Sequence, residues 1–175
     1  MDEARDRLQR LIREIPDFPK PGIRYKDICP LIRDPHGLRT AVHWMAEPYQ
    51  DQHVRVVAAP DARGFIFGSA VAIQLGCGFV PIRKLGKLPG QTTSLTYDLE
   101  YGQDTVEVQS DAIQAGERVL LVDDVLATGG TMAACARLVE MLGGTIIGCQ
   151  FLLELTFLEG RARLKDYRLH SLLED

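Results

Sequence analysis

The stretch Val122-Asp123-Asp124-Val125-Leu126-Ala127-Thr128-Gly129-Gly130-Thr131 is the most informative part of this 175-residue chain. The residues Arg118–Asp124 form an apolar run that ends in two acids, which is typical of a central strand in a parallel sheet. Adjacent carboxylates repel each other, so folding alone does not favour this pair. A polyhydroxyl ligand or a divalent cation would relieve the repulsion.

The loop after the acids is rich in glycine and threonine and leads into a predicted helix. Glycines let backbone N–H groups approach an anion, and a helix N-terminus favours negative charge. Acceptors for sugar hydroxyls are thus followed along the chain by donors for a phosphate, and this order complements the groups of a ribose phosphate. The plain alternative is a strand, an ordinary turn and an N-cap threonine. A Walker loop is excluded because no lysine follows Gly130, and the G-x-G-x-x-G fingerprint is absent.

The sequence on both sides alternates between strand and helix patterns. We expect strands at 54–59, 79–82, 118–124 and 145–153, helices at 4–15, 37–49, 65–75 and 132–142, and extended strands within 91–109 joined by a turn at Tyr101-Gly102. Repeated strand–helix–strand units predict an α/β fold with a parallel sheet. Ligands of such sheets bind at the carboxyl ends of strands. The segments 61–63, 83–87 and 123–131 all follow predicted strands, so they should face one cleft.

Composition narrows the class of protein. Hydrophobic residues make up 46% and charged residues 25%, as in a globular domain, and the formal net charge of -4 argues against a nucleic-acid partner. No segment approaches the ~18 consecutive apolar residues of a membrane span, and the charged N-terminus is unlike a signal peptide. We therefore expect a cytoplasmic protein with no membrane partner. The four cysteines, Cys29, Cys77, Cys135 and Cys149, form no C-x-x-C pair and are expected to be buried free thiols.

The segment 122–131 resembles the motif with which type I phosphoribosyltransferases bind 5-phosphoribosyl 1-pyrophosphate (PRPP). Four more segments resemble the adenine phosphoribosyltransferases in particular: DFPKPGI at 17–23, ARGFIFG at 62–68, IRKLGKLPG at 82–90 and YDLEYG at 97–102. The resemblance runs in order from about residue 5 to residue 173. It implies one domain over 1–175, with a central, mostly parallel sheet flanked by helices, a small N-terminal hood at 1–35 and a mobile lid loop at 90–105.

The activity implied by the resemblance is transfer of the 5-phosphoribosyl group of PRPP to N9 of adenine, giving AMP and pyrophosphate in purine salvage. It also implies a homodimer and a Mg²⁺ ion held mainly by PRPP, with Asp123 and Asp124 as further candidate ligands. Two rivals stay open: an enzyme of the same superfamily that uses another purine, and a PRPP-sensing regulator without catalysis. A structural protein would explain neither the acid pair nor the glycine loop.

The PRPP-binding residues follow from the same resemblance. Asp123 and Asp124 would hold the ribose hydroxyls, although Asp124 could instead be a local cap. The 5-phosphate would be wrapped by a run of small residues, namely Ala127, Thr128, Gly129, Gly130 and Thr131.

A basic cluster would serve the pyrophosphate. Arg83, Lys84 and Lys87 would form a clamp, because arginine grips phosphate in a bidentate way and lysine supplies mobile charge. The alternative is a solvated surface charge run. Arg63 would reach the purine and the leaving pyrophosphate, or it could pair with Asp61 and pin the turn. The family often has a non-proline cis peptide here, which would fall at Asp61-Ala62.

The remaining candidates concern catalysis and the base. By resemblance Glu100 would act with Arg63 and Lys84 in catalysis, accepting the N9 proton or stabilising positive charge on the sugar, and Tyr101 would help to orient the 5-phosphate or the nucleophile. Without the resemblance, the sequence favours an exposed acid on a hairpin at Glu100.

The adenine pocket would include Ile23, Arg24 and Lys26, with backbone groups recognising the edge of the base. The family usually has an apolar or aromatic residue in place of Arg24 and often arginine in place of Lys26. An inward-facing Arg24 would offer a donor and weaken the preference for adenine.

Overall fold

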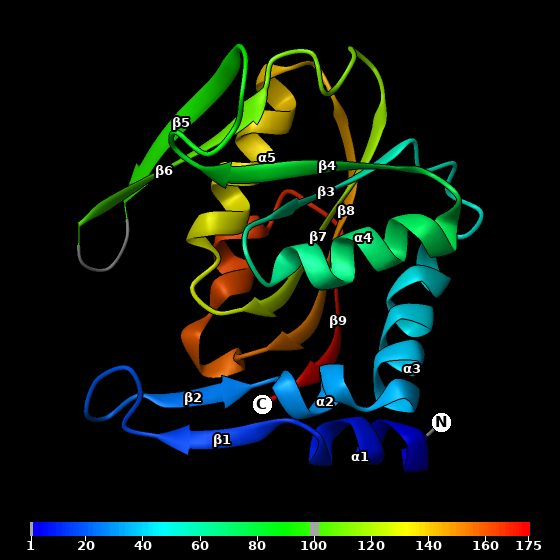
Figure 1. Cartoon of the computed structure of the whole chain (residues 1–175), viewed down its shortest axis with the longest axis vertical. Coiled ribbons are helices and arrows are strands. Elements are labelled where there is room, and N and C mark those ends of the chain that lie inside the picture. Colours follow the sequence, from blue (N-terminus) through cyan, green and yellow to red (C-terminus); the bar gives the residue numbers. More distant parts are fainter. Residues whose placement is uncertain (1, 99–101) are drawn as a thin grey trace. The chain divides into compact units, whose positions relative to one another are not determined.

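The computed structural model describes residues 2–98 and 102–175, which divide into two compact units, 1–44 and 45–175. The first unit contains helix α1 (Asp2–Arg10), strands β1 (Arg13–Pro16) and β2 (Arg24–Asp27), and helices α2 (Cys29–Arg33) and α3 (Pro35–Ala46), the last of which runs into the second unit (Figure 1). Strands β1 and β2 form an antiparallel pair in which Ile15 lies opposite Tyr25. The first unit is therefore a small helix-and-hairpin layer.

The predicted helix over residues 4–15 is wrong at its C-terminal end. Helix α1 stops at Arg10, and the amides of Leu11 and Ile12 turn back onto the carbonyls of Leu8 and Gln9 at 3.0 and 3.1 Å. Ile15 then lies on β1. Its helical spacing from Leu8 is overridden by cross-strand pairing with β2, a contact that periodicity cannot detect.

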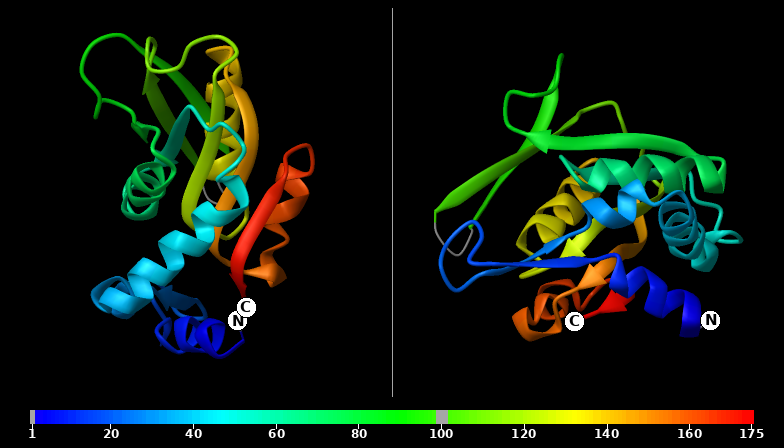
Figure 2. Two further views of the ribbon diagram at one scale, coloured as in Figure 1. Left: turned by 90° about the vertical axis from the view of Figure 1, so that its right-hand side faces the viewer. Right: turned by 60° about the horizontal axis from the view of Figure 1, so that its bottom comes forward.

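The second unit is built on a seven-stranded sheet with the order β5-β6-β4-β3-β7-β8-β9. Its strands are β3 (Val56–Pro60), β4 (Gly78–Lys84), β5 (Thr92–Asp98), β6 (Gln103–Gln109), β7 (Arg118–Leu126), β8 (Thr145–Glu154) and β9 (Leu169–Glu174). The five strands from β4 to β9 in this order are mutually parallel, and β5 and β6 add antiparallel at one edge. The prediction of a mostly parallel α/β sheet is thus confirmed. The β5–β6 hairpin extends away from the parallel strands (Figure 2).

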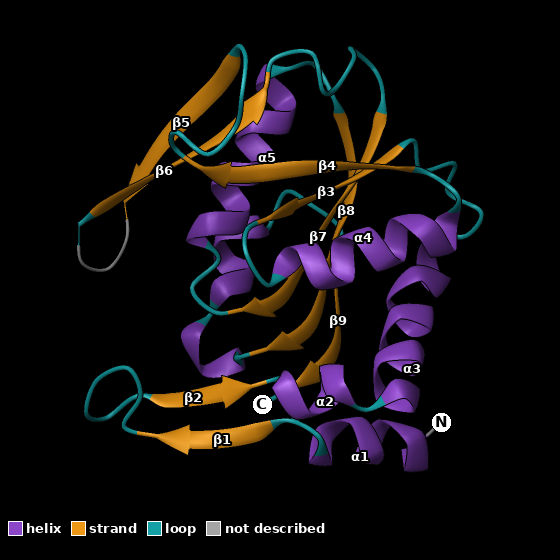
Figure 3. Ribbon diagram, viewed as in Figure 1, coloured by secondary structure: helices purple, strands orange, loops and turns teal. Residues whose placement is uncertain are grey.

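Helices α4 (Gly64–Leu75) and α5 (Gly130–Met141) cover opposite faces of this sheet (Figure 3). The crossover through α4 leads from β3 to β4, and the one through α5 leads from β7 to β8, in the opposite direction along the sheet. Right-handed crossovers in opposite directions must place their helices on opposite faces. Accordingly Gly68 of α4 packs on Ala59, whereas α5 belongs to the core cluster that contains Val56 and Ala58.

Strand β9 is an addition to the predicted elements, the last of which is the strand at 145–153. It pairs in parallel with β8, from Cys149 opposite Leu169 to Glu154 opposite Glu174. Short 3-10 turns connect the two strands: Thr156–Leu158 and Gly160–Leu164. A further turn, Glu47–Tyr49, follows α3, so the helix predicted over 37–49 begins and ends slightly earlier than expected.

Two other expectations are tested by the described residues. None of the four cysteines forms a disulfide bond, and Cys135 and Cys149 are buried, but Cys77 is half-buried and Cys29 is exposed. Over residues 2–98 and 102–175, no helix is both long and apolar enough to cross a membrane.

Candidate functional site

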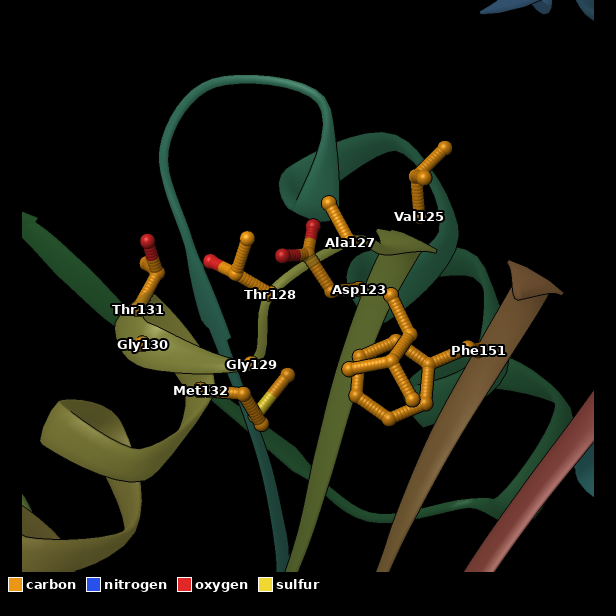
Figure 4. Close-up of a pocket in the computed structure, with 10 residues that line it drawn as sticks. Asp123, Val125, Ala127, Thr128, Gly129, Gly130, Thr131, Met132 and Phe151 are labelled. Atoms are coloured by element: carbon orange, nitrogen blue, oxygen red, sulfur yellow. The ribbon is translucent and has the colours of Figure 1, made fainter. Parts of the chain in front are cut away.

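A small pocket lies at the carboxyl end of β7, where the strand passes into α5. Its walls come from one continuous stretch plus one neighbouring side chain: Asp123, Val125, Leu126, Ala127, Thr128, Gly129, Gly130, Thr131, Met132 and Phe151. The Asp123 carboxylate and the hydroxyls of Thr128 and Thr131 lie on the same side of the loop (Figure 4). The acceptors and donors predicted for a ribose phosphate therefore share one pocket.

The backbone of the loop at 127–129 packs closely against the backbone at Gly160. Gly129, which precedes α5, has φ +78, a left-handed conformation that favours glycine. A Cβ atom on Gly129 would lie only 2.5 Å from the carbonyl oxygen of Gly160, and one on Gly160 would collide with the carbonyl oxygen of Ala127. Sequence reasoning missed Gly160, because its partner lies over thirty residues away along the chain.

The two acids of the pair differ in their surroundings. Asp124 is buried, and its Oδ2 forms an ion pair at 2.7 Å with the Nε of Arg63. Asp123 is half-buried on the pocket wall and accepts the Asp124 amide at 2.9 Å. Burial raises the pKa of Asp123 well above its ordinary value, and the neighbouring Asp124 charge adds to the effect. Burial also raises the pKa of Asp124, and the Arg63 guanidinium offsets this only in part.

The three segments expected at one cleft do converge. Arg63 follows β3 and reaches Asp124 at the end of β7, while a Cβ on Gly64 would lie 2.8 Å from the Asp123 Oδ1. Asp61 pairs with Arg83 of β4, with 3.2 Å between Oδ2 and Nε. The Asp61-Ala62 peptide bond is cis, as the family resemblance implied.

The basic segment after β4 is tied to its neighbours. Lys84 pairs with Asp104 of β6 at 3.1 Å, and the hydrogen bond to that carboxylate raises the pKa of the lysine. The Arg83 Nη1 donates to the Lys87 carbonyl at 3.1 Å, and the Lys87 side chain is exposed. The structure thus brings Arg83 to Asp61 and to the backbone of Lys87. The phosphate-binding role of Arg83, Lys84 and Lys87 stays a prediction.

The predicted base-binding residues gather on β2 and the turn before it. Arg24 and Lys26 alternate onto the same face of β2, and both bind the carboxylate of Glu14 on β1, at 2.6 and 2.9 Å. These two hydrogen-bonded cations lower the pKa of Glu14, with Lys26 contributing more. Ile23 is exposed. The side chain of Arg24 is therefore engaged by a carboxylate that sequence reasoning missed.

Two predicted residues, Glu100 and Tyr101, lie outside the described residues. The end of β5 just before them reaches the pocket loop, where the Tyr97 hydroxyl lies 3.1 Å from the Thr131 hydroxyl. Tyr97 was not singled out from the sequence, since only the fold brings β5 next to α5.

Comparison with known proteins places this geometry in a family. Residues 32–171 match the model of the phosphoribosyl transferase domain. The adenine phosphoribosyltransferase of Clostridium perfringens is 56% identical over 167 residues, which are 95% of this chain and 97% of the relative. The crystal structure of the adenine phosphoribosyltransferase of Rhodothermus marinus superposes with a TM-score of 0.96 at 49% identity, covering both chains completely.

A second similar structure was solved as a complex. The adenine phosphoribosyltransferase of Saccharomyces cerevisiae, complexed with D-2,5-dideoxy-2,5-imino-altritol 1,6-bisphosphate and adenine, has a TM-score of 0.93 at 37% identity and covers 99% of this chain and 100% of its own. Family model, sequence identity and fold agree over nearly the full length. The chain therefore belongs to the phosphoribosyltransferase family, and within it to the adenine phosphoribosyltransferases.

Proposed function

We propose that this protein transfers the 5-phosphoribosyl group of PRPP to N9 of adenine, releasing AMP and pyrophosphate. The observation that carries the proposal is the pocket after β7, where one acidic side chain and the loop 127–131 offer a sugar phosphate both acceptors and donors. Family membership supports the same reaction, and the yeast relative was solved with adenine and a bisphosphate.

The 5-phosphate end is bound by the start of α5 in this proposal. The backbone amides of 127–131, together with the Thr128 and Thr131 hydroxyls, donate to the phosphate oxygens, and the helix dipole favours the anion. Asp123 accepts the ribose hydroxyls from the pocket wall. Asp124 stays paired with Arg63 and so holds the arginine beside the reacting groups.

The pyrophosphate end is served by the basic segment after β4. Neutralising the charge on pyrophosphate makes it a better leaving group. Lys84 and Lys87 supply mobile positive charge, and Arg83 completes the cluster. Magnesium, which the family generally uses with PRPP, fits an oxygen-rich site with a carboxylate. Asp123, which lines the pocket, would complement PRPP oxygens, and the ion would neutralise pyrophosphate charge, whereas Asp124 is already engaged by Arg63.

The base is recognised on β2. Ile23 offers an apolar contact to a flat purine, while the backbone of Arg24 and Lys26 reads its edge. Because Glu14 engages both side chains, Arg24 does not need to present its guanidinium to the base. This arrangement supports adenine, whose exocyclic amine donates hydrogen bonds, over purines that carry an oxo group in its place.

Glu100 is the proposed acid–base residue, on the strength of the family resemblance. As the bond between N9 and C1 forms and the bond from C1 to pyrophosphate breaks, the N9 proton passes to the Glu100 carboxylate. Tyr101 orients the 5-phosphate. Replacing Glu100 by alanine should lower kcat while PRPP still binds, as measured by steady-state kinetics and calorimetry. Full turnover in that variant would remove the residue from catalysis.

We further propose a cytoplasmic homodimer. Helix α4 exposes Ile73 at 82% and Ile66 at 36%, apolar surface that a second subunit would cover. Light scattering on the purified protein distinguishes a dimer from a monomer.

Incubation with adenine, PRPP and magnesium, followed by detection of AMP, tests the function directly. Parallel reactions with hypoxanthine, guanine and xanthine test the choice of base, and a chelator tests the metal. AMP formation that stops on chelation is expected. Absence of AMP, or faster product formation from another purine, would overturn the proposal.

A further inference from the structure

A buried carboxylate on β6 lies behind the basic segment that follows β4. Glu107 is only 3% exposed and stands between the buried Val106 and Val108. No ion pair to it is found among residues 2–98 and 102–175. A buried charge without an opposite charge is costly unless hydrogen bonds satisfy it, so its surroundings need an explanation.

Two donors from the loop after β4 and one from the start of β5 supply those hydrogen bonds. The backbone amides of Lys87 and Leu88 donate to Oε1 at 2.9 and 3.0 Å, and the Thr92 hydroxyl donates to Oε2 at 3.1 Å. Burial alone would raise the pKa of Glu107, but the hydrogen bonds from Leu88, Thr92 and Lys87 outweigh it and lower the pKa below its ordinary value. The side chain is therefore ionised at neutral pH.

Lys87 is held at both ends of its backbone. Its amide donates to Glu107, and its carbonyl accepts from the Arg83 Nη1 at 3.1 Å. Arg83 in turn pairs with Asp61, in the same post-β3 turn as Arg63. The loop needs such an anchor because it contains Gly86 and Gly90, both at φ +78 with open space around them.

We infer that Glu107 is a positioning residue for the pyrophosphate end of PRPP: it fixes the backbone at Lys87 and Leu88, and thereby places the Lys87 ammonium group. This inference rests on the proposed function. Glu107 does not touch the substrate. It acts through the loop, which brings positive charge to where negative charge develops on the leaving group.

The variant Glu107→Gln tests the inference, because the amide keeps the size of the side chain. Its NH2 group would face donors, so at least one of the three present hydrogen bonds is lost. We expect the KM for PRPP to rise about 10- to 100-fold, as a small misplacement of a binding group can cause. Inhibition by pyrophosphate should weaken in parallel, while the KM for adenine stays unchanged.

Glu117→Gln is the matched control. Glu117 accepts a loop amide, that of Gln114, at 2.9 Å and pairs with Arg55, but it precedes β7, at the strand end away from the pocket. This control should change the melting temperature without altering either KM. Thr92→Val, which removes only the donor to Oε2, should raise the KM for PRPP by less than Glu107→Gln does. It supplies the test if Glu107→Gln does not fold.

Two results would overturn the inference. One is a Glu107→Gln enzyme, or in its place a Thr92→Val enzyme, with a lower melting temperature but unchanged KM for PRPP and unchanged inhibition by pyrophosphate. The other is an equal loss of affinity for both substrates. Calorimetric titration of wild type and variants with pyrophosphate alone distinguishes failure of the proposed function from failure of the proposed role of Glu107. If the wild type makes no AMP but binds pyrophosphate more tightly than the variants do, the proposed function is contradicted and the role of Glu107 is supported.

Discussion

Replacement of Gly129 by alanine should damage the pocket loop in two ways. The first is conformational: at φ +78 a Cβ atom costs about 1–2 kcal/mol. The second is steric, because the new Cβ would lie 2.5 Å from the Gly160 carbonyl oxygen, roughly 1 Å inside ordinary contact. Overpacking of this kind costs a further ~1–3 kcal/mol.

Of the two segments in this contact, the loop that contains Gly129 must move, and the segment at Gly160 cannot. Gly160 is anchored, since the next residue, Arg161, pairs at 2.7 Å with the buried Glu154, and the Ser171 hydroxyl donates to the other carboxylate oxygen of Glu154 at 2.7 Å. A displacement of roughly 1 Å in the loop would shift the backbone amides that we propose bind the phosphate. On that scale kcat/KM for PRPP falls up to ~100-fold.

Gly116→Ala isolates the conformational part. Gly116 has φ +82, a Cβ atom on it would meet nothing within 4 Å, and it lies before β7, away from the pocket. Thermal unfolding and PRPP-dependent kinetics at saturating adenine should show a moderate loss of stability for Gly116→Ala and no kinetic change. Gly129→Ala should lose more stability and most of its kcat/KM for PRPP. Identical behaviour of the two variants in both assays would refute the steric argument.

Three further predictions concern other contacts. Asp123→Asn should raise the KM for PRPP more than that for adenine, and its melting temperature at neutral pH should match or exceed that of wild type, since burial already disfavours the charge; a PRPP KM equal to wild type would contradict this. Tyr97→Phe removes the hydroxyl 3.1 Å from Thr131 and should raise the KM for PRPP a few-fold, read from initial rates; an effect on adenine alone would speak against it. The pKa of Asp27 is lowered to about 2, below its unfolded value, by hydrogen bonds from the amide and thiol of Cys29 and from the Arg13 guanidinium. The ionised side chain therefore stabilises the fold above pH ~4, and this contribution is lost as the pH falls toward 2. The difference in melting temperature between wild type and Asp27→Asn should shrink over that range, and a constant difference would exclude the mechanism.

The local parts of the fold could be predicted from the sequence. The apolar run before Asp123 gives a central strand, and the glycines of 129–130 give the loop and the start of α5, because these signals lie within a few residues of each other. The convergence of Arg63 with the acid pair also followed, since parallel strands end at one edge. Strand β9 could not be found this way, because Leu169–Glu174 is short and is stabilised by its pairing with β8.

The supporting residues of the site were missed for the same physical reason. Glu107, Gly160 and Tyr97 act on segments that lie 15 or more residues away in sequence, and only the folded sheet brings them there. The sequence gives no signal for Glu107. An acid between two valines is the alternation expected of a strand with one face in solvent, and only the fold buries the face that carries Glu107.

Two acids of the second unit, the buried Glu107 and the half-buried Asp123, differ in how well the fold satisfies their charge. Glu107 receives three hydrogen bonds from its own chain, and its pKa is lowered, so the fold has already satisfied the charge. Asp123 accepts one neighbouring amide, borders the charge of Asp124, and has a raised pKa. Its carboxylate faces an open pocket rather than a loop (Figure 4). Hydroxyl donors or a cation that arrive with the substrate would remove that cost at the end of β7. The ribose contact that we propose is therefore expected at Asp123 rather than at the better-satisfied acids.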